Sequence, residues 1–187
     1  QIVTDDVREA EQFLKQAMDA GYEGLMAKRL DSPYTPGIRG KRWLKIKPIL
    51  EPLDLVIIAA EYGYGRRHEW LSDYYLAARD ADTGKFLTVG KTFKGLTDAE
   101  IVEMTKRLKE LTIKRSPRSE SVIPRIVVEV AYNEVQTSPK YECHMALRFA
   151  RITRIREDKT PEEADTIQRV RQIYEAQFQK KGRYTTD

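Results

Sequence analysis

The chain has 187 residues, of which 41% are hydrophobic and 33% are charged, with a formal net charge of +4 and an isoelectric point near 9.0. No stretch approaches the roughly 18 consecutive apolar residues of a membrane-spanning helix, so we expect a globular protein with no membrane partner. A single cysteine, Cys143, excludes an internal disulfide and a zinc site built from cysteines. The amino end shows neither an initiator Met nor a secretory signal. We therefore expect a cytoplasmic protein, or a nuclear one if eukaryotic, whose sequence starts within a longer chain.

The first 50 residues predict a helix followed by two strands. Apolar residues follow helical spacing from Asp5 to Ala20, and Gly21 stands where a left-handed cap would end the helix. Strands are expected over residues 22–28 and 43–47, separated by a loop over residues 31–40. Pro48 to Pro52 is interpreted as a hinge.

Positive charge gathers on this first part of the chain. Residues 23–47 carry seven Lys or Arg side chains and, after Glu23, one acid, Asp31. Strict alternation places Leu44 and Ile46 on one face of the second strand, which we expect to be packed, and Trp43, Lys45 and Lys47 on the other. Two ammonium groups on one rigid face can bind a phosphate, with roughly 1.5–3 kcal/mol from each charged contact.

The rest of the chain is rich in predicted strands. These fall at residues 53–62, 74–80, 85–89, 126–136 and 145–154, and the first three form a meander. A helix is expected from Asp98 to about Leu111, capped by Thr97 and Glu100, and a mobile loop over residues 114–124. A last helix is expected to open at Thr160-Pro-Glu-Glu163 and to run to about Phe178. Five short strands with a helix after the third match the outline of a five-stranded OB barrel, although other small barrels have a similar count.

Three segments resemble motifs of the ATP-dependent DNA ligases of the archaeal and eukaryotic replicative type. Glu23-Gly-Leu-Met-Ala-Lys28 resembles motif IV, Trp43-Leu-Lys-Ile-Lys47 resembles motif V, and residues 148–159 resemble motif VI. The segments occur in family order, and the likeness extends over nearly the whole chain. Motif VI departs from the family at Ala150, where proline is common, which questions the local strand geometry.

The resemblance implies a mainly β, α+β fold in two parts. Residues 1–50 would be the last helix and strands of a nucleotidyltransferase (adenylation) domain, and residues 51–187 an OB-fold domain with motif VI and a C-terminal helix. The family's nucleophile is a lysine in a Lys-x-Asp-Gly motif, which becomes lysyl-AMP, and no Lys-x-Asp-Gly occurs in this sequence. No catalytic nucleophile is therefore assigned, and this C-terminal fragment is expected to be inactive by itself.

The same resemblance implies roles for individual residues, with ATP and Mg²⁺ as cofactors. Glu23 would help to hold the metal. The nucleotide phosphates would be bound by Arg39, Lys45, Lys47, Arg154, Arg156 and Lys159, the last three from motif VI. A regular strand would place Lys28 on the face opposite to Glu23, so either a bulge intervenes or only one of them faces the site.

Aromatic and basic residues also cluster between the first two predicted strands of the second part. Among them, Arg66 and Arg67 are our candidates for contact with a DNA backbone. The resemblance implies three further partners: nicked duplex DNA, the remainder of the ligase and, as an open possibility, a sliding clamp.

The predicted function is the sealing of nicks in duplex DNA through lysyl-AMP and DNA-adenylate intermediates. Two alternatives stay open. One is an RNA ligase or a messenger-RNA capping nucleotidyltransferase; the loop over residues 31–40 and the Arg156-Glu-Asp-Lys159 run favour DNA ligase over it. The other is a non-catalytic OB module that binds nucleic acid, which would need several exposed stacking aromatic residues. Aromatic residues make up 9% of this chain.

Overall fold

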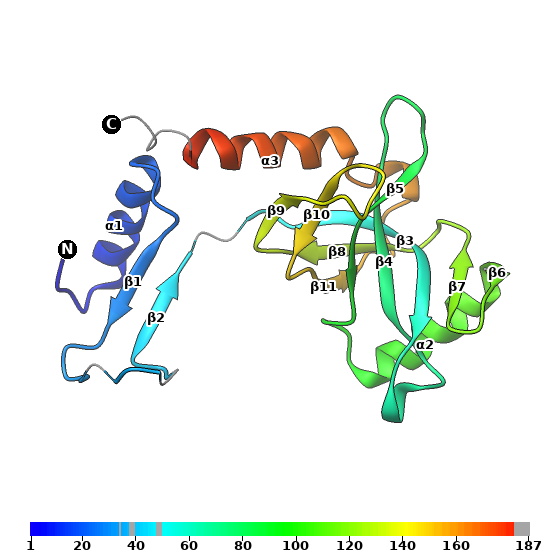
Figure 1. The fold of residues 1–187 in the computed structure, drawn as a ribbon, viewed down its shortest axis with the longest axis horizontal. Helices are drawn as coiled ribbons and strands as arrows, with labels where there is room; N and C mark the ends of the chain where they lie inside the picture. The colour runs from blue at the N-terminus through cyan, green and yellow to red at the C-terminus, as the bar shows by residue number, and fades with distance from the viewer. Residues whose placement is uncertain (34, 38–39, 48–49, 182–187) are drawn as a thin grey trace. The chain divides into compact units, whose positions relative to one another are not determined.

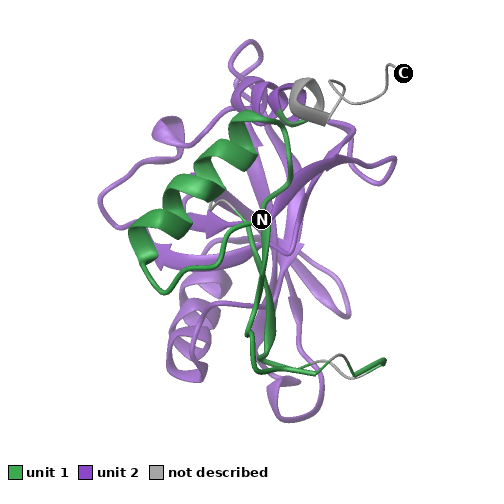
Figure 2. Ribbon diagram, turned by 90° about the vertical axis from the view of Figure 1, so that its left-hand side faces the viewer, with its two compact units in different colours: residues 1–49, 177–187 green, residues 50–176 purple. Residues whose placement is uncertain are grey.

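The computed structural model describes residues 1–33, 35–37, 40–47 and 50–181. The chain divides into two compact units (Figure 2), of which unit 1 comprises residues 1–49 and 177–187 and unit 2 comprises residues 50–176. The predicted hinge begins at Pro48, which lies outside the described residues.

Unit 1 contains the helix α1 (Val7–Asp19) and an antiparallel pair of strands, β1 (Leu25–Lys28) and β2 (Trp43–Ile46). The side chain of Asp6 caps α1 by accepting a hydrogen bond from the backbone N–H of Arg8. Gly21 follows the helix with a φ of +87°, so the predicted left-handed end is confirmed.

Unit 2 is built on an antiparallel sheet (Figure 1). Its main strands run in the order β11 (Arg151–Ile155), β8 (Val127–Ala131), β3 (Leu53–Tyr62), β4 (Leu71–Arg79) and β5 (Phe86–Thr92). The neighbourhood of β3, β4 and β5 confirms the predicted meander. The two ends of this order also meet, because the backbone N–H of Ile152 donates to the carbonyl of Lys94, just beyond β5, at 3.0 Å.

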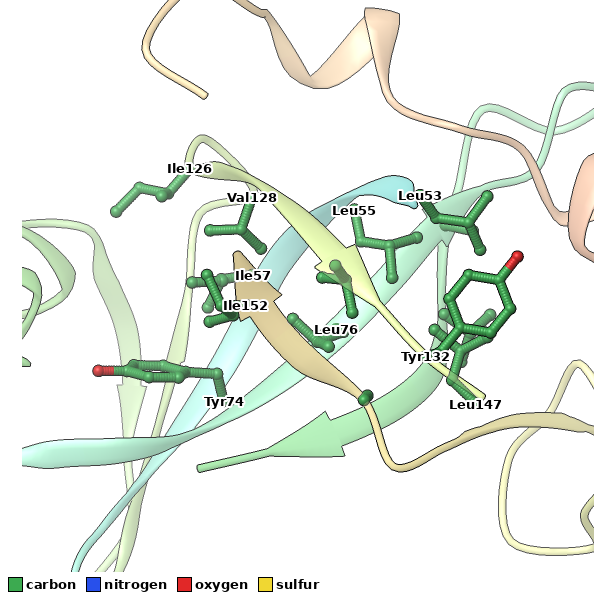
Figure 3. Close-up of a cluster of buried hydrophobic side chains, with 14 of the residues drawn as sticks. Leu53, Leu55, Ile57, Tyr74, Leu76, Ile126, Val128, Tyr132, Leu147 and Ile152 are labelled. Carbon is green, nitrogen blue, oxygen red and sulfur yellow. The ribbon is translucent and has the colours of Figure 1, made fainter. Parts of the chain in front are cut away.

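The core of unit 2 lies between these strands. Leu55 and Ile57 from β3, Leu76 from β4, Val128 from β8 and Ile152 from β11 are almost fully buried and lie together (Figure 3). A second antiparallel pair, β9 (Glu134–Thr137) and β10 (Met145–Arg148), adds buried side chains to the same core.

The helix α2 (Asp98–Glu110) follows β5, as predicted, and begins with the predicted capping box. The Thr97 hydroxyl accepts from the Glu100 backbone N–H at 3.3 Å, and the Glu100 carboxylate accepts from the Thr97 N–H at 2.7 Å.

The predicted mobile loop over residues 114–124 is wrong. It contains most of a hairpin of two strands, β6 (Thr112–Arg115) and β7 (Ser119–Val122), and β7 also pairs with the last residues of β3. The serines and prolines suggested a loop. In the structure Glu120 on β7 is buried, and its carboxylate accepts hydrogen bonds from the hydroxyls of Tyr62 and Thr112, which hold the hairpin in place.

Two long predicted strands are each divided in the structure. Residues 126–136 contain β8 and most of β9, and residues 145–154 contain β10 and most of β11. The second division falls at Phe149, whose φ of +56° no regular strand can accommodate, and at Ala150, where the sequence already departs from the motif.

The last helix begins later than predicted. Thr160 and Glu163 form the predicted capping box, but it caps a short 3₁₀ turn, η2 (Pro161–Glu163), and the helix α3 (Ile167–Lys181) starts four residues later. Between them the backbone is extended, because the N–H of Asp165 donates to the carbonyl of Asp54 at 2.8 Å and its carbonyl accepts from Arg79.

Candidate functional site

The lysine-bearing face of unit 1 is formed by the pairing of β1 with β2. Lys45 lies opposite Met26, and Lys28 lies opposite Trp43. Residues opposite each other in a sheet share a face, and residues two apart in one strand also share it. Lys28, Trp43 and Lys45 therefore point to one side, and the Lys28 ammonium lies 4.4 Å from the centre of the Trp43 ring.

Glu23 and Lys47 lie next to this face. Their side chains form an ion pair of 3.5 Å between Oε2 and Nζ, and both are more than half exposed. Gly24 has a φ of +145°, and a Cβ there would lie 2.1 Å from the carbonyl oxygen of Ile46. The regular strand therefore starts only at Leu25, so an irregularity at Gly24 separates Glu23 from the alternation of β1.

The opposite face of β2 is not packed as predicted. Leu44 is 53% exposed and Ile46 is 36% exposed, so the expectation of a buried apolar face is wrong for the part of unit 1 that the structure describes. An isolated two-stranded sheet has nothing of its own to pack on its apolar face, so that face stays exposed unless another element covers it. Arg39, the third phosphate-binding candidate from this part of the chain, lies outside the described residues.

The cations of motif VI meet a buried carboxylate in unit 2. Nη1 of Arg156 donates to both oxygens of Asp54, at 2.9 and 3.0 Å, and the ammonium of Lys159 donates to Oδ2 of Asp54 at 2.6 Å. The Asp54 side chain is only 12% exposed. Asp54 is fixed in turn, because its backbone N–H donates to the carboxylate of Asp165.

The other edge of the Arg156 guanidinium binds Asp158. Nε and Nη2 donate to its two oxygens at 2.9 and 2.7 Å, a bidentate pair. This hydrogen bonding holds the pKa of the Asp158 carboxyl well below its usual range, and it raises the pKa of Arg156. Arg154 differs from Arg156, since it is 63% exposed and reaches Asp158 only at 3.8 Å.

Asp54 was missed by sequence reasoning as a member of this cluster. The signal available was a lone acid within the apolar strand Leu53-Asp54-Leu55-Val56, where an unpaired carboxylate would be costly. Such a residue predicts a cationic partner, although the strand alone does not say which one.

The two candidate DNA contacts, Arg66 and Arg67, lie in a 3₁₀ turn, η1 (Gly65–Arg67), between β3 and β4. Both bind Asp98 at the start of α2, Arg67 at 2.6 Å and Arg66 at 3.0 Å. Arg66 is 76% exposed, whereas Arg67 is 26% exposed and donates to Asp98 through both Nε and Nη2. Arg67 thus fastens the turn to the helix, and Arg66 is the more accessible cation.

Glu23 is the candidate ligand for a divalent metal in unit 1. Within the described ranges, no three His, Cys, Asp or Glu side chains gather to hold a metal ion. Glu23 can supply one hard oxygen ligand, which suits Mg²⁺ because this ion keeps several waters and shares phosphate oxygens with its substrate.

Family models match both parts of the chain. The model described as ATP dependent DNA ligase domain matches residues 1–47, and the one described as ATP dependent DNA ligase C terminal region matches residues 67–159. The chain belongs to the ATP-dependent DNA ligase family, as the resemblance of its motifs predicts.

Curated relatives include archaeal DNA ligases. The chain is 60% identical over 179 residues to DNA ligase 1 of Korarchaeum cryptofilum, and 55% identical over 177 residues to a DNA ligase of Thermococcus onnurineus. These matches cover 96% and 95% of the chain but 33% and 32% of the relatives. The chain therefore spans about a third of the length of these relatives.

Solved structures agree with the fold. The ligase domain from M. tuberculosis LigD is 26% identical with a TM-score of 0.53, and the match covers 82% of this chain and 50% of that one. Pmar-Lig_PreS3, at 24% identity and a TM-score of 0.62, supports the fold alone; its match covers 81% of this chain and 32% of that one. The predicted class, mainly sheet with helices, is confirmed. Within the described residues, no helix is both long and apolar enough to cross a membrane.

Proposed function

We propose that the chain is part of an ATP-dependent DNA ligase that seals nicks in duplex DNA. In this proposal residues 1–50 belong to the adenylation domain and residues 51–187 form the OB-fold domain. The observation that carries the proposal is the face of β1 and β2 that holds Lys28 and Lys45, with Lys47 beside it, in a chain of this family.

The lysines act by electrostatic positioning. Lys45 and Lys47 neutralise charge on the α-phosphate of ATP as the adenylyl group is transferred, which is how phosphoryl-transfer sites lower their barrier. Glu23 supplies one ligand to the Mg²⁺ that accompanies the nucleotide. The acceptor lysine of that transfer belongs to another part of the whole enzyme, since this sequence has no Lys-x-Asp-Gly motif.

The motif VI cations bind the pyrophosphate that leaves. Arg154 is the most exposed of the three and can reach a phosphate directly, whereas Arg156 and Lys159 are held by Asp54. In the later steps Arg66 contributes a contact to the duplex backbone, and Arg67 keeps its turn in place. The alternative RNA ligase or capping reaction would use the same lysine face, so the substrate must be tested directly.

The test is the removal of Lys45 in a full-length ligase that carries this region. Lys45→Ala should lower the transfer of label from α-labelled ATP to the protein by roughly 100-fold or more, the usual effect of losing one preorganised donor. Lys41→Ala is the matched control, because Lys41 is an exposed lysine of the same segment that lies outside the strand.

Sealing of a nicked duplex and of a nicked RNA is then compared in the wild-type enzyme. Preferential sealing of the DNA nick supports the proposal. Normal label transfer in Lys45→Ala would refute the assigned role of Lys45. Preferential sealing of the RNA nick would refute duplex DNA as the substrate.

A further inference from the structure

A groove of about 720 Å³ lies on unit 2, away from the motif VI cluster in the sequence. The end of β3, the segment before β4, the helix α2 and the turn between β6 and β7 all contribute to its walls. The lining residues that matter here are aromatic or cationic: Tyr62, Trp70, Lys106, Lys109 and Arg118. We call this site the aromatic groove. Its volume is within the range of small-ligand sites.

The cations of the aromatic groove lie over aromatic rings. The ammonium of Lys109 is 5.7 Å from the centre of the Tyr62 ring, and the guanidinium of Arg118 is 4.4 Å from that of Tyr64. Tyr64 is 76% exposed and Arg118 is also exposed, so this cation–ring pair is accessible to a ligand. Lys106 is balanced by Glu103 at 3.5 Å, and the exposed Glu69 adds one negative charge to the lining. Lys109 and Arg118 are the cations of the groove that the proposal below assigns to phosphates.

The walls of the groove are held in place before any ligand arrives. The hydroxyl of Tyr62 donates to the buried carboxylate of Glu120 at 2.5 Å, which fixes the ring. The backbone N–H of Leu71, next to Trp70, donates to the hydroxyl of Thr105 on α2 at 3.0 Å. A preformed wall lowers the entropy cost of binding.

Aromatic rings interleaved with cations suit a ligand that has both a flat ring and a phosphate. We propose that the aromatic groove binds unpaired nucleotides of a single strand, with a base against Trp70 or Tyr62 and phosphates at Lys109 and Arg118. Bases within a duplex are stacked on one another and cannot lie on protein rings, whereas unpaired bases do so at about 1–3 kcal/mol each. This activity is additional to nick sealing and does not depend on it.

The chain contains a reporter for this test. It has two tryptophans, Trp43 and Trp70, so Trp43→Phe leaves Trp70 as the single source of tryptophan fluorescence. In that background a decamer of deoxythymidine should quench Trp70, and a blunt duplex of equal length should not. Free AMP is titrated in parallel. A mononucleotide offers the same kinds of group, a base and a phosphate, so this titration shows whether the ligand is a strand or a single nucleotide.

The decisive variant is Lys109→Ala with Arg118→Ala. Removing two phosphate contacts should lower the slope of log K against log salt by about 1.4, at about 0.7 per contact on a single strand, and should weaken decamer binding at least tenfold at low salt. The control is Lys85→Ala with Lys140→Ala, which removes the same charge from two exposed lysines that do not line the groove. This control should bind within about twofold of the parent.

Thermal unfolding of both double variants confirms that each is folded before binding is compared. Equal affinity of the two double variants, or equal quenching by duplex and decamer, would overturn the proposal. AMP binding as tight as decamer binding would overturn the strand as the ligand. Sealing by the whole ligase is measured separately, so failure of the groove leaves the proposed function intact.

Discussion

At the scale of single residues, Asp54 connects the fold to the candidate chemistry. Its carboxylate is buried beneath Arg156 and Lys159, so the two cations share one fixed counter-ion. Asp158 binds the same guanidinium but is 52% exposed. Water can therefore replace Asp158 far more easily than Asp54.

Asparagine at these two positions should separate the two roles. Asp54→Asn should lower the urea midpoint of the chain clearly more than Asp158→Asn, because it leaves two partly buried cations without their charge partner. Urea unfolding followed by circular dichroism measures both variants against the parent. Equal midpoints for the two variants would show that Asp54 does not anchor the cluster.

Glu61 predicts a dependence of stability on pH. Hydrogen bonds from Lys91 at 2.8 Å and from the hydroxyl of Tyr75 at 2.5 Å lower the pKa of Glu61, in a site where its side chain is 26% exposed. A folded-state pKa below the unfolded value stabilises the protein above the unfolded pKa, near 4.3, and this stabilisation is lost as the pH falls through the folded pKa.

Glu61→Gln should therefore be less stable than the parent at pH 7, and the difference should shrink below about pH 4.3. Lys91→Met removes the hydrogen bond that lowers the pKa of Glu61 most. The free energy of unfolding of this variant should therefore also fall less than that of the parent as the pH drops below about 4.3. Urea midpoints measured from pH 7 to pH 3 check both variants. A constant difference across this range would contradict the assignment.

Part of the candidate site follows from residue pattern alone. Alternation in a five-residue strand was sufficient to place Lys45 beside Trp43, because period two depends only on the backbone. The partners of Arg67 and Arg156 could not be predicted in this way. Asp98 and Asp54 lie 31 and 102 residues away from them in the sequence, and only the tertiary fold brings them together.

At the scale of elements, local signals succeeded wherever a local contact decides the structure. The capping box of α2 joins Thr97 to Glu100, and both residues were visible in one window of sequence. The start of α3 was misplaced because residues 164–166 bind the backbone of β3 and β4 instead. The hairpin of β6 and β7 was missed for a similar reason, because β7 is held in the sheet by its pairing with β3, which is distant in the sequence.

Gly95 shows how closely the segment after β5 approaches β11. Its φ is +115°, and an added Cβ would lie 1.8 Å from the carbonyl oxygen of Ile152. Gly84 also has a positive φ, of +71°, but a Cβ there would meet nothing within 4 Å. Comparing substitutions at Gly84 and Gly95 therefore distinguishes the cost of backbone strain from the cost of a collision with β11.

Gly84→Ala should cost about 1–2 kcal/mol, from the strain of a left-handed residue alone. Gly95→Ala should cost clearly more, because the carbonyl of Ile152 must move and its strand belongs to the core. Denaturant unfolding of the two variants makes the comparison. A loss at Gly95 no larger than that at Gly84 would mean that the segment can move aside.

At the scale of the whole molecule, the two units differ in how many buried hydrophobic side chains they contain. Unit 2 has a continuous cluster of buried side chains from β3, β4, β5, β8 and β11. In the part of unit 1 that the structure describes, Ala17 is the one buried hydrophobic residue, and Leu44 and Ile46, on the apolar side of β2, are 53% and 36% exposed. The exposed apolar side of β2 thus fits the proposal that residues 1–50 belong to an adenylation domain, whose other elements would cover this side in the whole ligase.

Hydrogen exchange of the intact 187-residue chain tests this difference in core. Amides of β1 and β2 should exchange at least 100-fold faster than those of β3 and β8, since local opening needs little free energy where few apolar side chains are buried. The pair β9 and β10 is the internal control. It is also two-stranded, but Val135, Met145 and Leu147 are buried in the core, so its amides should be protected. Mass spectrometry of exchanged peptides resolves all three regions in one experiment. Protection of β1 and β2 equal to that of β9 and β10 would show that unit 1 is stable by itself, and that the exposed apolar side of β2 needs no cover from other parts of the ligase.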